Sequence, residues 1–237
     1  YAENVYFGKP CGLMDQMASS VGGLCYIDFQ NPDPQITAIP YDFAKMGYQL
    51  VVVNTGGSHD DLTPAYASIP AEMKAVAQCF GQPDLRSVLP EQFLKELPRV
   101  RQQLKDQNAD RAIMRAAHYF AENRRVSDLV CALQRNDMPA FLNLIIESGR
   151  SSFEYLQNIF ATPDRQELSL ALMLAHTKLH NSGAWRVHGG GFAGTTLNFV
   201  PNAMLDSFVK EMEQVFGQHS CNVLAIRPEG PACIKLG

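Results

Sequence analysis

One carboxylate near the start of the chain is surrounded by apolar residues. The stretch from Pro10 to Ser19 reads PCGLMDQMAS, in which Asp15 lies three positions after Gly12. If a helix begins near Gly12, an acid in its first turn is favoured by free backbone N–H groups and by the helix dipole. This structural role explains an acid at Asp15 without any chemistry.

The residues around Asp15 favour a second interpretation. At helical spacing, three small residues share the face of Asp15: Ala18, Ser19 and Gly22. The apolar side chains of the same helix can then face a core: Leu13, Met14, Met17 and Val21. A strip of small side chains beside a carboxylate indicates that a ligand approaches Asp15 closely.

A second stretch that could bind a ligand is HGGGFAG, from His188 to Gly194, between two apolar β-forming runs. Glycines at a strand end permit positive φ angles and let backbone N–H groups approach a ligand, as phosphate-binding loops do. The stretch matches neither a P-loop nor the G-x-G-x-x-G motif. A β-hairpin with a glycine bulge explains it equally well, and we assign no role to His188.

A third stretch, SHDDLTPAY from Ser58 to Tyr66, contains three possible metal ligands: His59, Asp60 and Asp61. Adjacent residues on a short loop rarely converge on one ion without further ligands, so we predict a solvated loop and no metal site. Tyr66 can belong to the core or can offer its hydroxyl group to a sugar.

The composition excludes several classes of protein. The chain has 237 residues, 46% of them hydrophobic, a net charge of −4 and a pI near 5.9, without a run of basic residues. These values predict no binding to nucleic acid or to a membrane surface. The six cysteines are widely spaced, which predicts reduced thiols in a cytoplasmic protein whose partner is a small molecule or a protein.

The hydrophobic pattern predicts the elements that must position these residues. A helix from Gly12 and two strands, GLCYIDF and ITAIPY, come first, and QLVVVNT at 49–55 follows as a buried strand. We expect long helices at 110–134 and 138–146, and a third bracketed by Thr162, Pro163 and Gly183.

The last third of the sequence alternates strands and a helix. The expected strands lie at 184–188, 195–200, 222–227 and 232–236, and a helix lies at 204–216. With the strand at 49–55, this order predicts an α+β fold with helices packed on an antiparallel sheet.

Three stretches together resemble the galactokinase family of GHMP sugar kinases. PCGLMDQMAS resembles the galactokinase form of the family signature, and WRVHGGGFAGTT resembles the third, glycine-rich GHMP motif. HYFAENRRV, from His118 to Val126, is similar to a galactokinase helix with His and Glu-Asn at the same spacing. The resemblance covers the whole chain.

The resemblance also implies how the chain is organised. Residues 1–48 would be the end of the N-terminal GHMP domain, and residues 49–237 a C-terminal domain with a ferredoxin-like antiparallel sheet and long helices. The galactokinase segment with Gly-Glu-His-Thr-Asp and the serine-rich phosphate loop are not in this sequence. We therefore expect the C-terminal part of a galactokinase-like protein, inactive by itself.

Roles follow from the resemblance for individual positions. Asp15 matches the catalytic aspartate at the sugar's anomeric hydroxyl, Gly12 a glycine that contacts the sugar, and Tyr66 a sugar-contacting tyrosine. The positions that match the loop beside the phosphates are Gly189, Gly190, Gly191 and Gly194. Two departures stand out: Ile69 and Pro70 occupy the place of paired arginines, and Ala193 replaces a common glycine.

The implied reaction is transfer of the γ-phosphoryl group of ATP to the C1 hydroxyl of galactose, with Mg²⁺ held mainly by the absent N-terminal segment. Three alternatives remain. The first is a kinase for a related sugar, N-acetylgalactosamine or arabinose, and the second is a galactokinase-like protein that binds sugar and ATP but acts as a regulator through a partner. The third is a truncated, noncatalytic domain with a structural role. The motifs do not specify an oligomeric state.

Overall fold

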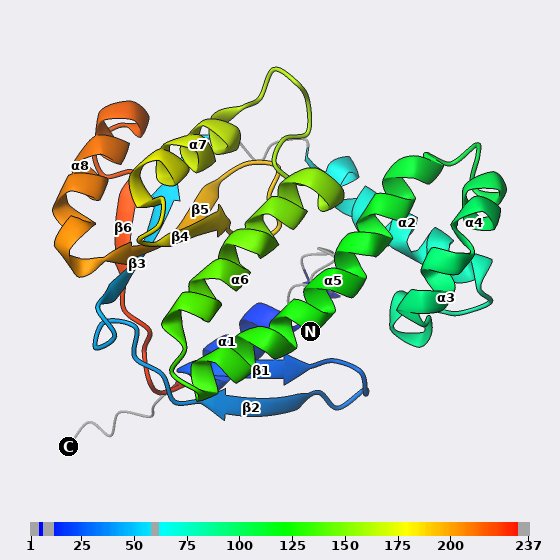
Figure 1. Ribbon diagram of the computed structural model, residues 1–237, viewed down its shortest axis with the longest axis horizontal. Coiled ribbons are helices and arrows are strands. Elements are labelled where there is room, and N and C mark those ends of the chain that lie inside the picture. The colour runs from blue at the N-terminus through cyan, green and yellow to red at the C-terminus, as the bar shows by residue number, and fades with distance from the viewer. Residues whose placement is uncertain (1–4, 7–11, 58–61, 232–237) are drawn as a thin grey trace. The chain divides into compact units, whose positions relative to one another are not determined.

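The computed structural model describes residues 5–6, 12–57 and 62–231, and it divides the chain into two compact units (Figure 1). Unit 1 comprises Tyr1–Asp42 and Ala225–Gly237, and unit 2 comprises Phe43–Leu224. Each unit is described by itself below. The predicted strand at 232–236 lies outside the described residues.

Among its described residues from position 12 onward, unit 1 contains a short helix and a β-hairpin. Helix α1 (Met14–Val21) is followed by β1 (Leu24–Asp28) and β2 (Gln35–Ile39), which pair antiparallel on either side of the Asn-Pro-Asp-Pro stretch at 31–34. The chain returns to this unit near its end, where Gly23 donates its N–H to the carbonyl of Arg227 over 2.7 Å.

The apolar residues of α1 do not face a core, contrary to the sequence prediction. Leu13, Met14 and Val21 expose 52%, 63% and 36% of their surface, and no residue of α1 is buried. The prediction was wrong because, in the part of the chain that the structure describes, no other element packs over these side chains.

Unit 2 is built on a four-stranded antiparallel sheet. The strands are β3 (Tyr48–Asn54), β4 (Ala184–Val187), β5 (Thr195–Pro201) and β6 (Cys221–Leu224), in the spatial order β4-β5-β3-β6. A β-α-β-β-α-β chain order with this strand order is the ferredoxin-like arrangement. The α+β prediction with an antiparallel sheet is confirmed.

The helices of unit 2 form two groups (Figure 1). Helices α6 (Met138–Ser151), α7 (Glu167–Leu179) and α8 (Leu205–Phe216) pack on the sheet, whereas α2 (Thr63–Cys79), α3 (Pro90–Lys95), α4 (Leu97–Gln103) and the start of α5 (Ala109–Gln134) form a helical layer beyond it. Each group has its own apolar core. In the first, Val51, Val53 and Phe208 are at most 1% exposed.

Several predicted boundaries were wrong: α6 continues to Ser151 instead of ending at 146, and β6 ends at Leu224 instead of 227. Helix α7 begins at Glu167, because Thr162 starts a turn in which its carbonyl accepts the N–H of Arg165. The predicted loop ending at Tyr66 is shorter, because Pro64 lies within the first turn of α2, where its fixed φ suits a helix. Tyr66 therefore lies on a helix.

Among the residues described, no helix combines the length and the apolar character that a membrane crossing requires.

Candidate functional site

The glycine-rich stretch forms the connection between β4 and β5. Three of its glycines have positive φ angles, +68° at Gly189, +80° at Gly191 and +93° at Gly194, and Phe192 has a φ of +60°. The stretch is thus a hairpin connection with left-handed residues, which is compatible with both interpretations of the sequence. We call residues 188–194 the glycine loop.

Tyr66 holds the glycine loop from the side of α2. Its hydroxyl group donates to the carbonyl of Gly191 over 2.7 Å, and its ring meets that of Phe192 edge to face with centroids 5.2 Å apart. Burial raises the pKa of the Tyr66 hydroxyl, which keeps it a donor at neutral pH. The structure thus brings together Tyr66 and the glycine loop, two features that the sequence predicted separately.

Two of the glycines have no space for a side chain. A Cβ atom on Gly190 would lie 2.7 Å from the ring of Tyr66, and a Cβ on Gly191 would overlap the carbonyl oxygen of Asn158. A Cβ on Gly189, in contrast, would meet no atom within 4 Å. The loop therefore requires glycine for packing at two positions and for conformation at others.

The end of β3 anchors the far side of the loop. Thr55 donates both its backbone N–H and its hydroxyl to the carbonyl of Gly194, over 2.9 and 2.8 Å, and the Thr55 side chain is buried. The sequence analysis did not identify Thr55. Its position directly after a buried strand was the only signal that could have indicated it.

Asn158 contacts the loop from a third direction, in the segment that follows the short helix Ser152–Leu156. Its side-chain Nδ2 donates to the carbonyl of Gly190 over 3.0 Å, and its own carbonyl accepts the N–H of Phe192 over 2.5 Å. The Asn158 side chain is only 3% exposed. No sequence signal pointed to it.

Part of the loop backbone stays available to a ligand. Within the described chain, the exposed Gly189 and Gly190 donate no hydrogen bond from their backbone N–H groups. Free N–H groups beside left-handed residues make a concavity that attracts anions. The loop can therefore bind a negatively charged oxygen.

A partly buried polar network joins α5, α6 and β4. Glu122 accepts a hydrogen bond from Ser148 and pairs with Arg125 and, over 3.5 Å, with Arg186. Arg186 is two residues before the loop and donates its Nε to the carbonyl of Val187. The network thus braces the strand from which the loop emerges.

His118 belongs to the same network. Its Nδ1 lies 2.9 Å from the hydroxyl of Ser151. Burial lowers the pKa of His118, and the charges of Arg125 and Arg186 lower it further, while the Glu122 carboxylate opposes them. His118 is therefore neutral at pH 7. His118 and Glu122 stand in the segment HYFAENRRV, but the ion pair of Glu122 with Arg186 of β4 was not predicted.

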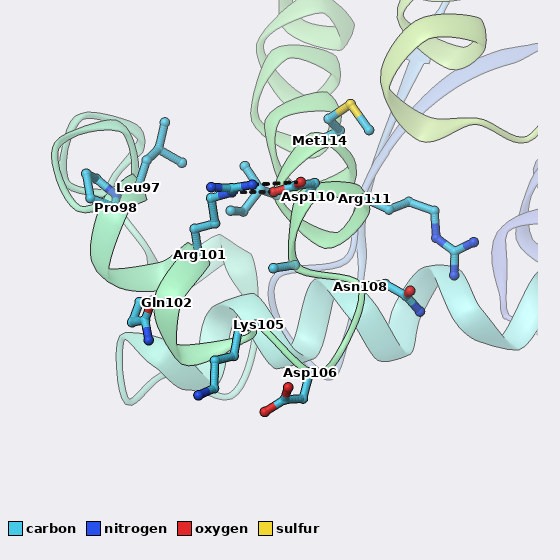
Figure 2. Close-up of a pocket in the computed structure, with 12 residues that line it drawn as sticks. Leu97, Pro98, Arg101, Gln102, Lys105, Asp106, Asn108, Asp110, Arg111 and Met114 are labelled. Atoms are coloured by element: carbon cyan, nitrogen blue, oxygen red, sulfur yellow. Dashed lines mark hydrogen bonds and ion pairs between the residues drawn. The ribbon is translucent and has the colours of Figure 1, made fainter.

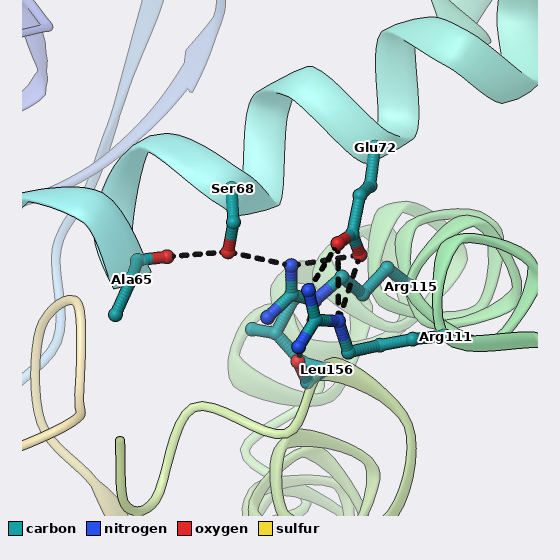
Figure 3. Close-up of polar contacts among 6 residues, drawn as sticks. All are labelled: Ala65, Ser68, Glu72, Arg111, Arg115 and Leu156. Carbon is teal, nitrogen blue, oxygen red and sulfur yellow. Dashed lines mark hydrogen bonds and ion pairs between the residues drawn. The ribbon is translucent and has the colours of Figure 1, made fainter. Parts of the chain in front are cut away.

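A second network, centred on the buried Glu72 and Arg115, fixes the helix that carries Tyr66 (Figure 3). Glu72 on α2 pairs with Arg111 over 2.5 Å and with Arg115 over 2.8 Å, both on α5. Arg115, 2% exposed, also donates to the hydroxyl of Ser68 and to the carbonyl of Leu156. These bonds tie α2, α5 and the segment before Asn158 together.

In unit 1, Asp15 and Gly12 lie at the start of α1. Asp15 is the second residue of the helix and is exposed, and none of the described side chains donates a hydrogen bond to it. Gly12 is exposed too, and a Cβ atom there would have open space around it. Pro10 and Cys11 of the signature lie outside the described residues.

The described residues contain no group of three or more His, Cys, Asp or Glu side chains that could hold a metal ion. His59, Asp60 and Asp61 lie outside the described residues. The four cysteines that the structure describes are free thiols: Cys25, Cys79, Cys131 and Cys221.

An open pocket of about 1290 Å³ lies elsewhere, between α4, the turn after it and the start of α5 (Figure 2). Its prominent feature is an exposed ion pair, in which Arg101 Nε lies 2.6 Å from an Asp110 carboxylate oxygen. None of the predicted site residues lines this pocket. It offers paired charges on the surface and no arrangement for catalysis.

Comparison with known proteins identifies the relatives of the chain. It is 34% identical to the galactokinase of Glaesserella parasuis over 88% of this chain and 51% of that protein. It is 32% identical to the galactokinase of Haemophilus influenzae, again over 88% of the chain and 51% of the relative. The chain thus spans about half the length of the curated relatives it matches. No family model matches it.

Two solved structures share the fold. Galactose-bound Lactococcus lactis galactokinase superposes with a TM-score of 0.73 and 22% identity, over 96% of this chain and 57% of that one. L. major mevalonate kinase with R-mevalonate gives a TM-score of 0.53 at 15% identity, over 92% of this chain and 53% of that one. The chain has the GHMP kinase fold, and the predicted similarity to galactokinases is confirmed.

Proposed function

We propose that this chain is part of a galactokinase, which transfers the γ-phosphoryl group of ATP to the C1 hydroxyl of galactose in the cytoplasm. The observation that carries the proposal is the similarity to curated galactokinases across 88% of the chain. The signature around Asp15 and the glycine loop, both inside this chain, support it.

In this proposal the glycine loop lies beside the phosphates of ATP. The free N–H groups of Gly189 and Gly190 supply donors for phosphate oxygens, and the left-handed Gly191 and Gly194 give the backbone its curvature. Phosphoryl transfer depends mainly on positioning and on stabilisation of charge. A loop whose shape is fixed before the ligand binds suits that task.

Asp15 would accept the proton of the sugar's C1 hydroxyl, or orient that hydroxyl through a charge-assisted hydrogen bond. Its place at an exposed helix start makes it accessible to a sugar, and Gly12 leaves space for close approach. An arginine from the upstream segment, which the resemblance implies, would keep the carboxylate ionised after the sugar covers it.

Tyr66 would contact the sugar while it holds the loop. A phenolic hydroxyl donates one hydrogen bond and can also accept one. In this proposal the Tyr66 hydroxyl, which donates to the carbonyl of Gly191, would accept a hydrogen bond from a sugar hydroxyl. If one hydroxyl group contacts both the sugar and the Gly191 carbonyl, binding of the sugar would affect the position of the glycine loop.

We further propose that residues 1–48 complete an N-terminal domain, whereas residues 49–237 form the C-terminal GHMP domain. The division of the structure near Asp42 supports a boundary in this region. Magnesium would be held mainly by upstream residues, as the resemblance to galactokinases implies.

The test compares the purified 237-residue chain with the same chain expressed together with its upstream coding sequence. We expect galactose-dependent ATP consumption only from the longer protein, because the sugar-gripping and phosphate-loop motifs are absent from this chain. N-acetylgalactosamine and arabinose serve as alternative substrates in the same assay. Turnover by the short chain, or its absence from the longer protein with all three sugars, would contradict the proposal.

A further inference from the structure

Asn158 contacts the glycine loop through both its backbone and its side chain, although no motif includes it. It lies between two residues of the loop that are separated by Gly191: its Nδ2 donates to the carbonyl of Gly190, and its carbonyl accepts the N–H of Phe192. A Cβ on Gly191 would also come within 2.6 Å of Nδ2. Asn158 thus touches the loop on both sides of one glycine.

These bonds determine how two consecutive peptide groups point. The carbonyl and the N–H of a planar trans peptide point in opposite directions, and no cis peptide occurs in the described chain. The peptide between Gly191 and Phe192 is held at both ends, by Tyr66 at its carbonyl and by Asn158 at its N–H. The preceding peptide is held by Nδ2 of Asn158 at its carbonyl, so that the N–H of Gly191 points away from Asn158.

One atom of the Asn158 side chain lowers the stability of the fold, which indicates that the amide group is there for another reason. Its Oδ1 is buried and has no hydrogen-bond partner among the residues that the structure describes. A buried acceptor without a partner destabilises a protein, so an apolar side chain would suit this site better if it only filled space.

We propose that Asn158 is a positioning residue that sets the orientation of the peptide groups around Gly191, and with it the direction of the Gly191 N–H and the position of the adjoining N–H donors of Gly189 and Gly190. Only the final step, in which these donors bind phosphate oxygens, rests on the proposed function. Asn158 itself acts through the loop and is not assigned a contact with the substrate.

The test uses the complete 237-residue chain labelled with ¹⁵N at its 17 glycines and followed by NMR. In Asn158→Asp at pH 8, the introduced carboxylate repels the Gly190 carbonyl, and we expect the signals of Gly190 and Gly191 to shift. Burial raises the pKa of the introduced carboxyl, so on acidification it takes up a proton and can donate to Gly190 again. The two signals should therefore return toward their wild-type positions as the pH falls to about 5.5.

The control is Asn181→Asp, which makes the same change at an exposed asparagine and should leave the loop signals in place. If Asn158→Asp does not fold, Asn158→Ala removes the amide without adding charge and should shift the same two signals at every pH. Loop signals identical to wild type in the folded variant would overturn the proposal.

Addition of ATP separates this inference from the proposed function. Shifts of the loop glycine NMR signals when ATP is added to the wild-type chain would support phosphate binding. Asn158→Ala should then lower the affinity for ATP roughly five- to tenfold, which is the scale of one hydrogen bond. ATP binding of equal strength in the two proteins would overturn the role of Asn158 in ligand binding. A wild-type loop that does not respond to ATP would count against the proposed function.

Discussion

The helix that carries Asp15 and the glycine loop differ in how firmly the described chain holds them. Every residue of α1 is at least partly exposed, and Asp15 receives no hydrogen bond from the described side chains. The glycine loop is held by Tyr66, Thr55 and Asn158, which come from three separate segments of unit 2.

This difference shows which half of the proposed chemistry is preorganised here. The glycine loop, which is the proposed phosphate side, has a backbone held by hydrogen bonds from three segments, so little reorganisation is needed if a ligand binds there. The sugar side has a carboxylate of the right type on an exposed helix, whose proposed arginine partner lies upstream. Substitutions in the two regions should therefore affect different measurable properties.

The largest effect on stability is expected from Glu72→Ala, which removes the brace on the helix of Tyr66. Arg115 would remain buried without its partner, and loss of one member of a buried ion pair costs about 3 to 5 kcal/mol. Urea unfolding of the purified chain measures this loss. The control Asp110→Ala breaks the exposed pair with Arg101 and should leave the unfolding midpoint unchanged. Equal effects of the two variants would show that the brace is unimportant.

Gly191→Ala tests the loop itself. The φ of +80° disfavours any other residue, and the added methyl group would overlap Asn158, so we expect a loss of roughly 2 to 4 kcal/mol in unfolding free energy. Gly189→Ala is the matched control, with a φ of +68° but open space, and should cost about 1 to 2 kcal/mol. If the two variants unfold at the same urea concentration, the close contact between Gly191 and Asn158 does not contribute to stability.

In contrast to the two preceding substitutions, Asp15→Asn should lower turnover and leave stability nearly unchanged. Because α1 is exposed, the urea midpoint should change little, and galactose binding should persist in the protein expressed with its upstream sequence. Turnover of that protein should fall at least ~10²-fold, the scale of one general base. Steady-state kinetics with galactose and ATP measure the effect, with Asp28→Asn as a control on the neighbouring hairpin. Near-normal turnover would remove Asp15 from the chemistry.

The smallest expected effect is the contribution of His118 to the pH dependence of the unfolding free energy. Burial lowers the pKa of His118 in the folded protein, so the unfolded chain binds this proton more readily, and stability decreases as the pH falls below about 6.5. The decrease is at most ~1.4 kcal/mol per pH unit until the folded-state pKa is reached. Urea unfolding between pH 7.5 and 5.5 should show a weaker dependence in His118→Gln than in wild type. The exposed His219→Gln should behave as wild type, and an unchanged slope in His118→Gln would contradict the burial argument.

Local patterns predicted most of the secondary structure. The β-branched run in β3 and the apolar repeat of α5 were located because burial of one face leaves a period in the sequence. The start of α7 was misplaced, since Thr162 and Pro163 form a helix start and a turn equally well. The exposure of Leu13 and Met14 was also missed, because periodicity shows that a face is apolar but not that anything covers it.

By itself, the sequence determined the types of chemical group: a carboxylate in a specific signature, a run of glycines, and the similarity to galactokinases. Only the tertiary structure decided how the glycine loop is held. The bonds that fix it join Thr55 to Gly194 across 139 positions and Asn158 to Gly190 across 32. Such contacts leave no local pattern, because the residues meet only after the sheet and helices have packed.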